Sequence, residues 1–424
     1  MSGDPPPLAP NANLWSVLCN RSCRSTALWL FVLMTSAYFL TAQGRIDIVD
    51  GAMRFDVTHN LIELGKPVLR HKFPSVQGPD LDFYAHYEFG TSVLAMPLVL
   101  LARWLAPGSL DAEQFAFTLT TIPFAALTVC LLFLAFVRLG QTPTSARNWA
   151  LACGFGSMLW PYAGSTFDMA PQAFCLTLGI LAGADALLFQ SARLGMLSGL
   201  GFFGLATIQE TYLLLAGPVV LAVSRLDWRE PFRNLRRPAF VWIAAGLIAG
   251  LLAVLAYNYL RFEDPFRTGR ESQRHPTFGN PLWGLAGLLL SPAKCLFLYS
   301  PLHVLGIVGL CRLWRKELGW ALPALATFVA QVLLISCLCY WAGEWAWGPR
   351  YLLATAPLVL LGVPFALSHE QRHLQRAFVG AAVLVQLLGI SVDTQVYYFN
   401  KNFRPHFWLY NETMYTDSPL LRRP

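Results

Sequence analysis

The amino-acid sequence predicts an all-α membrane protein, a polytopic bundle of about 11 transmembrane helices with interfacial helices on its outer side. The chain has 424 residues, of which 55% are hydrophobic and 13% are charged, whereas soluble domains carry about 25% charged residues. The charged residues cluster between long apolar runs. The net charge is +7, and no basic stretch is interleaved with aromatic residues in the manner of RNA-binding strands. We therefore expect membrane lipids as partners and no nucleic acid.

Nine apolar runs are long enough to cross a bilayer, which requires about 17–25 residues. They are residues 27–43, 115–137, 148–167, 170–189, 239–259, 296–313, 319–340, 350–367 and 376–393. The segment 195–224 supplies two more spans as a hairpin of short helices, because one tilted span would bury Glu210 at a cost of roughly 2.5–3.5 kcal/mol. The segment 91–106 contains Pro97 and is predicted to lie along the interface.

The positions of arginine and lysine predict the orientation. Short loops on the cytoplasmic side are typically rich in these residues. Assigning the short loops that are rich in arginine and lysine to the cytoplasm predicts that the N-terminus lies inside and the C-terminus outside. Residues 1–26 then form a disordered cytoplasmic segment, residues 27–393 the transmembrane catalytic domain, and residues 394–424 a tail on the outer face. The outer loops are 44–114 and 260–295, and the expected location is the plasma or inner membrane.

Charged residues are concentrated in these two outer loops. Asp47, Asp50 and Asp56 follow the first span, and Asp47 and Asp50 share a helix face at a spacing of three. A cluster of arginines at 261–274 departs from the positive-inside tendency. Two interpretations remain open for it: long loops escape that tendency, or the outer face binds an anion.

Five motifs occur in the order found in one family of enzymes. They are DGAMRFDVTHNLIELGKPV, HYEFGTSVLAMPLVLLARWL, LWPYAGSTFDMAPQAFCLTL, SPAKCLFLYSPLHVLGIVGLCRLWRK and WAGEWAWGPRYLLATAPLVLL. They resemble the GT-C membrane glycosyltransferases, nearest to the family 39-like, phospholipid-carrier-dependent transferases, and the resemblance runs from about residue 27 to 367. Protein O-mannosyltransferases and lipid A aminoarabinose transferases are more distant relatives.

The resemblance implies transfer of a hexose or pentose, with inversion, from a polyprenyl-phosphate donor to a lipid, glycan or protein acceptor on the outer face. By motif position Asp50 is the general base, with Asp168 as the second catalytic carboxylate and Asp47 as a secondary candidate. A base must reach the acceptor hydroxyl, and a lipid-borne donor arrives in the membrane plane, so a carboxylate just beyond the first span is well placed. A first-turn acid favoured by the helix dipole is the alternative interpretation of Asp47.

The leaving phosphate requires cations, and Arg350 in WGPRY is the best candidate, with an interfacial anchor as its alternative role. Two positions depart from the family pattern: His86 stands where relatives often have Lys, and Glu210, a secondary candidate, stands where a cation is usual. The other candidates for substrate or phosphate binding are Glu88, Arg261, Arg270 and Lys294.

No cofactor is assigned. A divalent metal is possible, but the carboxylates and imidazoles lack a spacing typical of a metal site, so no residue is assigned as a ligand. Two other functions remain open: a transporter or lipid flippase, and an inactive protein of the same fold. Internal repeats and charges within spans would favour transport; the sequence shows no clear repeat, and Asp185 and Glu210 are the exceptions in otherwise uncharged runs.

Overall fold

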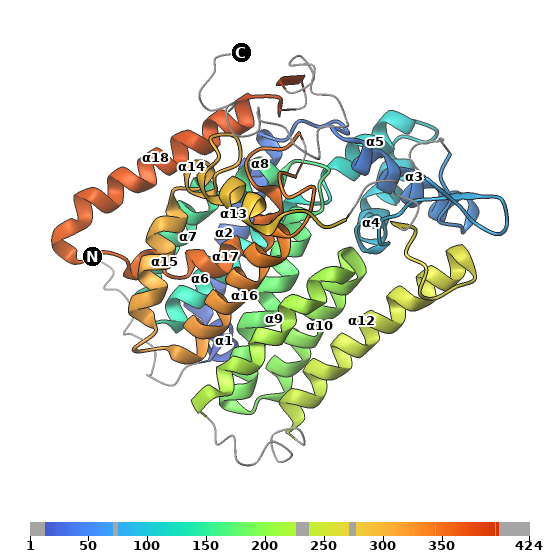
Figure 1. The fold of residues 1–424 in the computed structure, drawn as a ribbon. Coiled ribbons are helices and arrows are strands. Elements are labelled where there is room, and N and C mark those ends of the chain that lie inside the picture. The colour runs from blue at the N-terminus through green and yellow to red at the C-terminus, as the bar shows by residue number, and fades with distance from the viewer. Residues whose placement is uncertain are drawn as a thin grey trace.

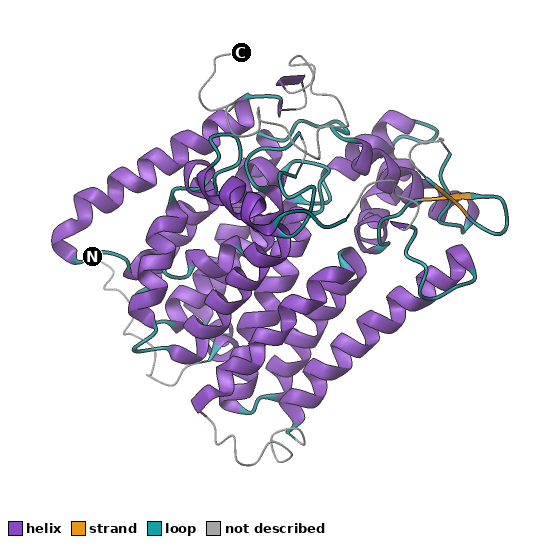
Figure 2. Ribbon diagram, viewed as in Figure 1, coloured by secondary structure: helices purple, strands orange, loops and turns teal. Residues whose placement is uncertain are grey.

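The computed structural model describes residues 13–70, 75–225, 237–270, 277–343, 345–394 and 396–397. This part of the chain is almost entirely helical, as Figure 2 shows. Its one small sheet pairs β1 (Val76–Gln77) with β2 (Phe83–Tyr84) in antiparallel register. The predicted all-α class is therefore confirmed.

The helices succeed one another along the whole described chain. Up to residue 208 they are α1 (Leu14–Cys19), α2 (Arg21–Leu40), α3 (Val49–Leu64), α4 (Gly90–Leu105), α5 (Leu110–Thr118), α6 (Ile122–Arg138), α7 (Pro143–Gly156), α8 (Leu159–Ala163), α9 (Met169–Phe189) and α10 (Ala192–Ile208). Beyond it follow η1 (Glu210–Arg225), α12 (Pro238–Phe262), α13 (Pro281–Leu290), α14 (Leu296–Tyr299), α15 (Leu302–Leu313), α16 (Leu318–Ser336), η3 (Arg350–Ala354), α17 (Ala356–Leu360), η4 (Val363–Phe365), η5 (His369–Gln371) and α18 (Arg372–Ser391).

Six helical stretches of the described chain are long and apolar enough to cross a membrane. They are Arg21–Leu40, Leu110–Arg138, Met169–Phe189, Pro238–Phe262, Leu318–Ser336 and His373–Ser391. Other predicted spans fall on shorter pieces: the run 148–167 is divided between α7 and α8, and the run 350–367 among η3, α17 and η4. The run 195–224 consists of two shorter helices, as predicted, because α10 ends at Ile208 and η1 begins at Glu210.

The prediction that residues 1–26 are disordered is wrong for residues 13–26. Asn13 caps α1 with a capping box, and the Asn20 side chain accepts hydrogen bonds from the first turn of α2. Such caps stabilise helix starts by about 1 kcal/mol each, and the Leu14 N–H also donates to the buried Asp185 carboxylate (2.8 Å). Residues 1–12, and the predicted tail apart from 394 and 396–397, lie outside the described residues.

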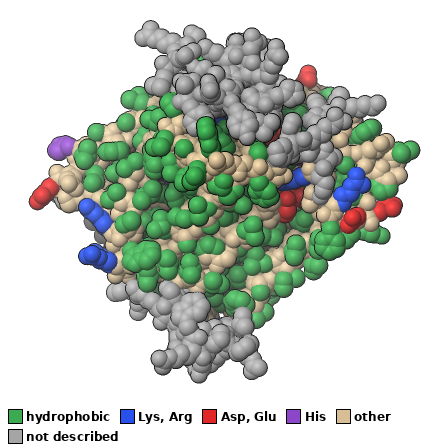
Figure 3. Space-filling view, viewed as in Figure 1, with side chains coloured by type: hydrophobic (Ala, Val, Ile, Leu, Met, Phe, Trp, Pro, Cys, Tyr) green, Lys and Arg blue, Asp and Glu red, His purple; other side chains and the backbone are tan. Residues whose placement is uncertain are grey.

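Helices α9, α10 and α12 lie side by side in the bundle (Figure 1). The contact between α10 and α12 is close because Gly199 meets Gly246: a Cβ at Gly246 would lie 2.2 Å from the Gly199 carbonyl oxygen. Small residues of this kind allow membrane helices to approach closely. Away from this contact, α12 exposes large apolar side chains, among them Ile248 and Leu252, and apolar side chains cover much of the face in Figure 3.

The first predicted outer loop forms a separate group of elements at one side of the bundle. Helices α3, α4 and α5 lie together there with the β1–β2 hairpin (Figure 1). Helix α4 packs against α3 and α5 and leaves Leu100, Leu101, Trp104 and Leu105 exposed. This one-sided distribution fits the interfacial helix predicted for 91–106.

Candidate active site

Four segments that are distant in the sequence meet near the start of α3. They are the first turn of α3 with Asp50, the segment 85–88, the turn 165–168 before α9, and η3 with Arg350 at its first position. Asp50 lies in the first turn of α3, where the helix dipole favours a carboxylate. The structure thus brings together Asp50 and Arg350, which are 300 residues apart in the sequence. The family resemblance predicts Asp50 as the general base and Arg350 as the cation that binds the phosphate.

Asp50 is surrounded by donors and cations. Arg350 Nη1 lies 3.8 Å from its Oδ2 atom, and the Tyr87 hydroxyl donates a hydrogen bond to it. Burial by itself would raise the pKa of Asp50, but the charges of Arg350 and Arg54, the Tyr87 hydrogen bond and the nearby His86 outweigh it and lower the pKa below its usual value. The carboxylate is therefore ionised at neutral pH, which a general base requires.

The side chain of Arg350 is 4% exposed and packs against aromatic rings. The guanidinium carbon lies 4.2 Å from the centre of the Phe167 ring and 4.8 Å from that of Tyr351, whose hydroxyl accepts a hydrogen bond from Nη2 (3.1 Å). Gly343, at φ +69°, lets the preceding loop pass close to the side chain, because a Cβ there would lie 2.8 Å from Arg350 Cγ. Ring faces attract cations, so this setting orients the fork of donors.

Asp168 forms a buried ion pair with Arg54, with 2.8 Å between Oδ2 and Nη2. Sequence reasoning missed Arg54. The signal was available, because Arg54 follows Asp50 by four residues and therefore shares its face of the helix. Two aspartates that the resemblance assigned to catalysis are thus connected through one arginine, which also lies 4.3 Å from the centre of the Tyr87 ring.

Asp47 binds the turn before α9. Its carboxylate accepts hydrogen bonds from the Ser165 hydroxyl (2.9 Å), from the Thr166 N–H (3.2 Å) and from the Thr166 hydroxyl. Beside it lies an open pocket of about 40 Å³ lined also by Tyr162, Phe167 and Trp347. That volume holds a few water molecules at most. The hydrogen bonds of Asp47 therefore serve to fix the turn that carries Asp168.

Glu88, Glu210 and Arg270 form a second charged cluster near the first. Arg270 Nη2 lies 3.5 Å from the Glu210 carboxylate. Glu88 is 3% exposed, and its carboxyl lies close enough to that of Glu210 for the two side chains to share a hydrogen bond. Burial and the neighbouring Glu210 charge raise the pKa of Glu88 to about 8, against the opposing influence of Arg261 and Arg270. The Glu210 charge also raises the pKa of Arg270, although burial opposes it.

Two of the predicted phosphate-binding cations are directed at backbone carbonyls. Arg261, which is 1% exposed, donates to the carbonyls of Ala85 (2.5 Å) and Tyr87 (3.2 Å) and so fixes the segment that carries His86 and Glu88. Lys294 is fully buried, and its Nζ donates to the Ala346 carbonyl (2.6 Å) in the loop before Arg350. The His86 ring lies against Tyr87, with 4.2 Å between ring centres.

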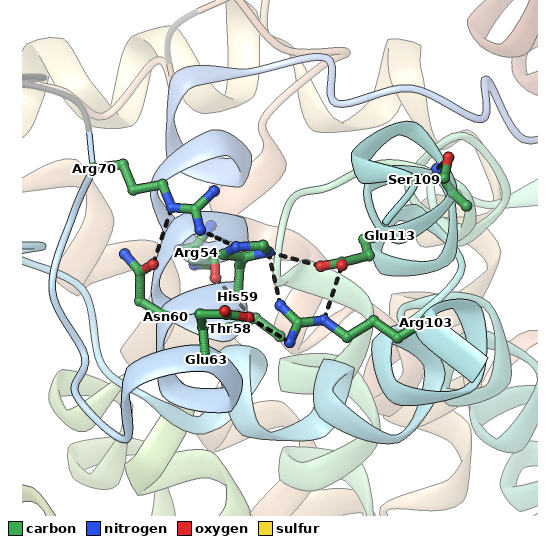
Figure 4. Close-up of polar contacts among 10 residues, drawn as sticks. Arg54, Thr58, His59, Asn60, Glu63, Arg70, Arg103, Ser109 and Glu113 are labelled. Carbon is green, nitrogen blue, oxygen red and sulfur yellow. Dashed lines mark hydrogen bonds and ion pairs between the residues drawn. The ribbon is translucent and has the colours of Figure 1, made fainter. Parts of the chain in front are cut away.

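A polar network joins α3, α4 and α5 behind the site (Figure 4). His59 Nδ1 lies 2.7 Å from Glu113, whose other oxygen accepts a hydrogen bond from Arg103 Nε (2.8 Å). Arg103 also reaches Glu63 (2.9 Å), and Arg70 contacts His59 from the opposite side. Because this network is buried and connected, it fixes the three helices relative to one another.

Metal ligands are not concentrated anywhere in the described part of the chain. No group of three or more His, Cys, Asp or Glu side chains lies close enough to hold an ion among those residues.

Comparisons with known proteins place the fold. No family profile and no curated protein sequence matches the chain. Among solved structures, ArnT from Cupriavidus metallidurans in the apo state superposes with a TM-score of 0.57 at 13% identity, covering 87% of this chain and 75% of ArnT. ArnT from the same organism bound to undecaprenyl phosphate gives a TM-score of 0.53 at 13% identity, covering 87% and 76%. This chain therefore shares the polytopic helical fold of ArnT, which agrees with its long apolar helices.

Proposed function

We propose that this protein transfers a sugar from a polyprenyl-phosphate donor to an acceptor on the outer face of the membrane, with inversion at the anomeric carbon. The single observation that carries the proposal is the pairing of Asp50 with Arg350 at 3.8 Å. An ionised carboxylate suits a general base, and an arginine fork suits a phosphate. The likeness to ArnT, of which one structure holds undecaprenyl phosphate, supports a lipid-phosphate donor.

The proposed step follows from these two groups. The acceptor hydroxyl oxygen attacks the anomeric carbon while Asp50 takes the hydroxyl proton. The bond from that carbon to the phosphate oxygen breaks, and the polyprenyl phosphate leaves with the electron pair. Arg350 meets the developing negative charge. The looseness of its contact with Asp50 favours this role, because the arginine can turn from the carboxylate to a phosphate without breaking a tight ion pair.

The orientation belongs to the same proposal. With the N-terminus in the cytoplasm, the group formed by α3, α4 and α5 faces outward, and exposed apolar side chains of α4 such as Trp104 and Leu105 lie at the interface. A donor carried in the outer leaflet would then present its phosphate near the level of Arg350.

The test is sugar transfer by purified protein from labelled polyprenyl-phosphate hexoses and pentoses, comparing the wild type with Asp50→Asn. Asparagine keeps the size and polarity of aspartate but cannot take a proton. We expect transfer by the wild type and a loss of about a hundredfold or more in the variant. Equal transfer by both proteins would move the base elsewhere. No transfer by either, over the donor panel, would favour a transporter or an inactive protein of the same fold.

A further inference from the structure

Arg54 occupies a central place among the groups of the proposed active site. Its Nη2 donates to Asp168 (2.8 Å), its guanidinium lies 4.3 Å from the centre of the Tyr87 ring, and the hydroxyl of Tyr87 hydrogen-bonds Asp50. The side chain is 5% exposed. The backbone is fixed as well, because the Arg54 carbonyl accepts hydrogen bonds from the hydroxyls of Thr58 (2.8 Å) and Ser92 (3.0 Å).

We infer that Arg54 is the positioning residue that assigns different roles to the two aspartates: it holds Asp168 in an ion pair and keeps Asp50 charged, so that Asp50 alone serves as the base. This inference rests on the proposed function. It adds Arg54 to the site and gives a physical reason why Asp50, and not Asp168, is the base.

The two carboxylates stand in different relations to Arg54. This arginine lies one helical turn after Asp50 and lowers the pKa of Asp50 through its charge, while its Nη2 pairs directly with Asp168 at 2.8 Å. A carboxylate engaged by a buried arginine at 2.8 Å is a weak proton acceptor, whereas the Asp50 carboxylate, at 3.8 Å from its nearest arginine, keeps oxygen lone pairs available.

Binding of the donor changes which cations act on Asp50. The groups that face Asp50 are Arg350 from η3, Arg54 on its own helix, and Tyr87 and His86 from the segment before α4. In the proposed reaction a phosphate occupies Arg350 and cancels much of its charge. Arg54 is paired with Asp168, so it remains the fixed cation that keeps Asp50 ionised when the base is needed.

The experiment compares the pH dependence of kcat/KM for the wild type, Arg54→Gln, Arg54→Lys and a control, Arg45→Gln. Arg45 is an exposed arginine paired with Asp393 at the C-terminal end of α18 and lies outside the site. We expect Arg54→Gln to move the acidic limb of the profile upward by about one pH unit, since the charge of Arg54 lowers the pKa of Asp50 and removing an opposite charge raises a carboxylate pKa. Arg54→Lys should restore most of the profile, and Arg45→Gln should leave it unchanged.

A second measurement does not depend on activity. Thermal unfolding of Arg54→Gln, Asp168→Asn and the double variant forms a cycle. If the two residues act as a pair, Arg54→Gln lowers the unfolding midpoint strongly, because it leaves Asp168 charged and alone, and adding Asp168→Asn restores much of the loss. The double variant also provides a folded protein for the pH profile if Arg54→Gln alone does not fold.

The outcomes separate the inference from the proposed function. An unmoved acidic limb in a folded, active Arg54 variant would overturn the effect on Asp50, and additive shifts in the unfolding cycle would overturn the pairing with Asp168. Absence of transfer by the wild type would contradict the proposed function and with it the role of Asp50 as base. In that case the cycle still decides whether Arg54 and Asp168 act together.

Discussion

Helix α9 has a buried aspartate near each end, and the two differ in how completely their surroundings satisfy them. Asp185, near the C-terminal end, accepts hydrogen bonds from the Leu14 N–H (2.8 Å) and from Trp320 Nε1 (2.7 Å) and pairs with Arg138 (3.4 Å). Asp168, at the N-terminal end, has one side-chain partner among the described residues, Arg54, whose own Nη1 is buried without a partner there.

The difference separates a structural use of buried charge from a functional one. Asp185 is completely hydrogen-bonded by three elements of the bundle, so it serves to hold α1, α6 and α16 together. At the N-terminal end of α9, Arg54 Nη1 is buried without a partner among the described residues, and the ion pair of Asp50 with Arg350 is loose. Native structures rarely leave buried polar groups unpaired unless a site uses them, so we expect substitutions at the two ends to differ in effect.

The largest effect is expected at the N-terminal end of α9, beside Asp50. Arg350→Gln should reduce sugar transfer by about 10²–10³-fold, because removing one preformed donor to a developing charge has that effect in other enzymes. The measurement is kcat/KM with a labelled donor, and thermal unfolding reports whether the variant still folds. Unchanged transfer in a folded Arg350→Gln variant would mean that the charged groups around Asp50 are as purely structural as those around Asp185.

Substitutions near Asp185, at the C-terminal end of α9, should lower the stability of the fold without changing activity. Arg138→Gln leaves the Asp185 carboxylate buried and without its cation, which costs about 3–5 kcal/mol. The unfolding midpoint in detergent should therefore fall clearly, and Asp185→Asn in the same protein should recover part of it. The activity of the molecules that remain folded should match that of the wild type. A specific loss of transfer would show that Asp185 and its partners also serve function.

The packing between α3 and the turn before α9 gives a smaller effect. A Cβ at Gly51 would lie 2.3 Å from Thr166 Oγ1, so Gly51→Ala should destabilise the fold by about 1–3 kcal/mol and reduce transfer by displacing Asp50. Gly380→Ala is the matched control, since the structure has open space there. If both variants behaved alike, close contact at Gly51 would not be what places the base.

The last expected effect is gradual, because at Glu88 it is spread over several pH units. Its pKa in the folded protein is raised to about 8 from an ordinary 4.5, so between these pH values the folded state binds more protons than the unfolded state. Stability should then fall as pH rises through this window, by at most about 1.4 kcal/mol per pH unit, and level off above it. Glu88→Gln should flatten this dependence of the unfolding midpoint, and a dependence of wild-type size in the variant would assign it to other groups.

Local sequence patterns were sufficient for most of the helices. Runs such as 170–189 and 239–259 are apolar over their whole length, and a bilayer-length apolar run has few alternatives to a helix. The break at Gln209 and Glu210 was also predictable, because a charge in the middle of an apolar run is costly. The division of 148–167 at Ser157 was missed, since a bend within an apolar run depends on what packs against it.

The sequence by itself determined the all-α class, the positions of the long apolar helices, and the presence of a carboxylate just after the first one and an arginine in WGPRY. Only the tertiary structure decided that Asp50 faces Arg350, that Arg54 pairs with Asp168, and that Arg261 and Lys294 are directed at backbone carbonyls. The reason is physical: hydropathy acts locally along the chain and can be recognised from neighbouring residues. Ion pairs between residues 114 or 300 positions apart depend on how the helices pack, which no short stretch of sequence specifies.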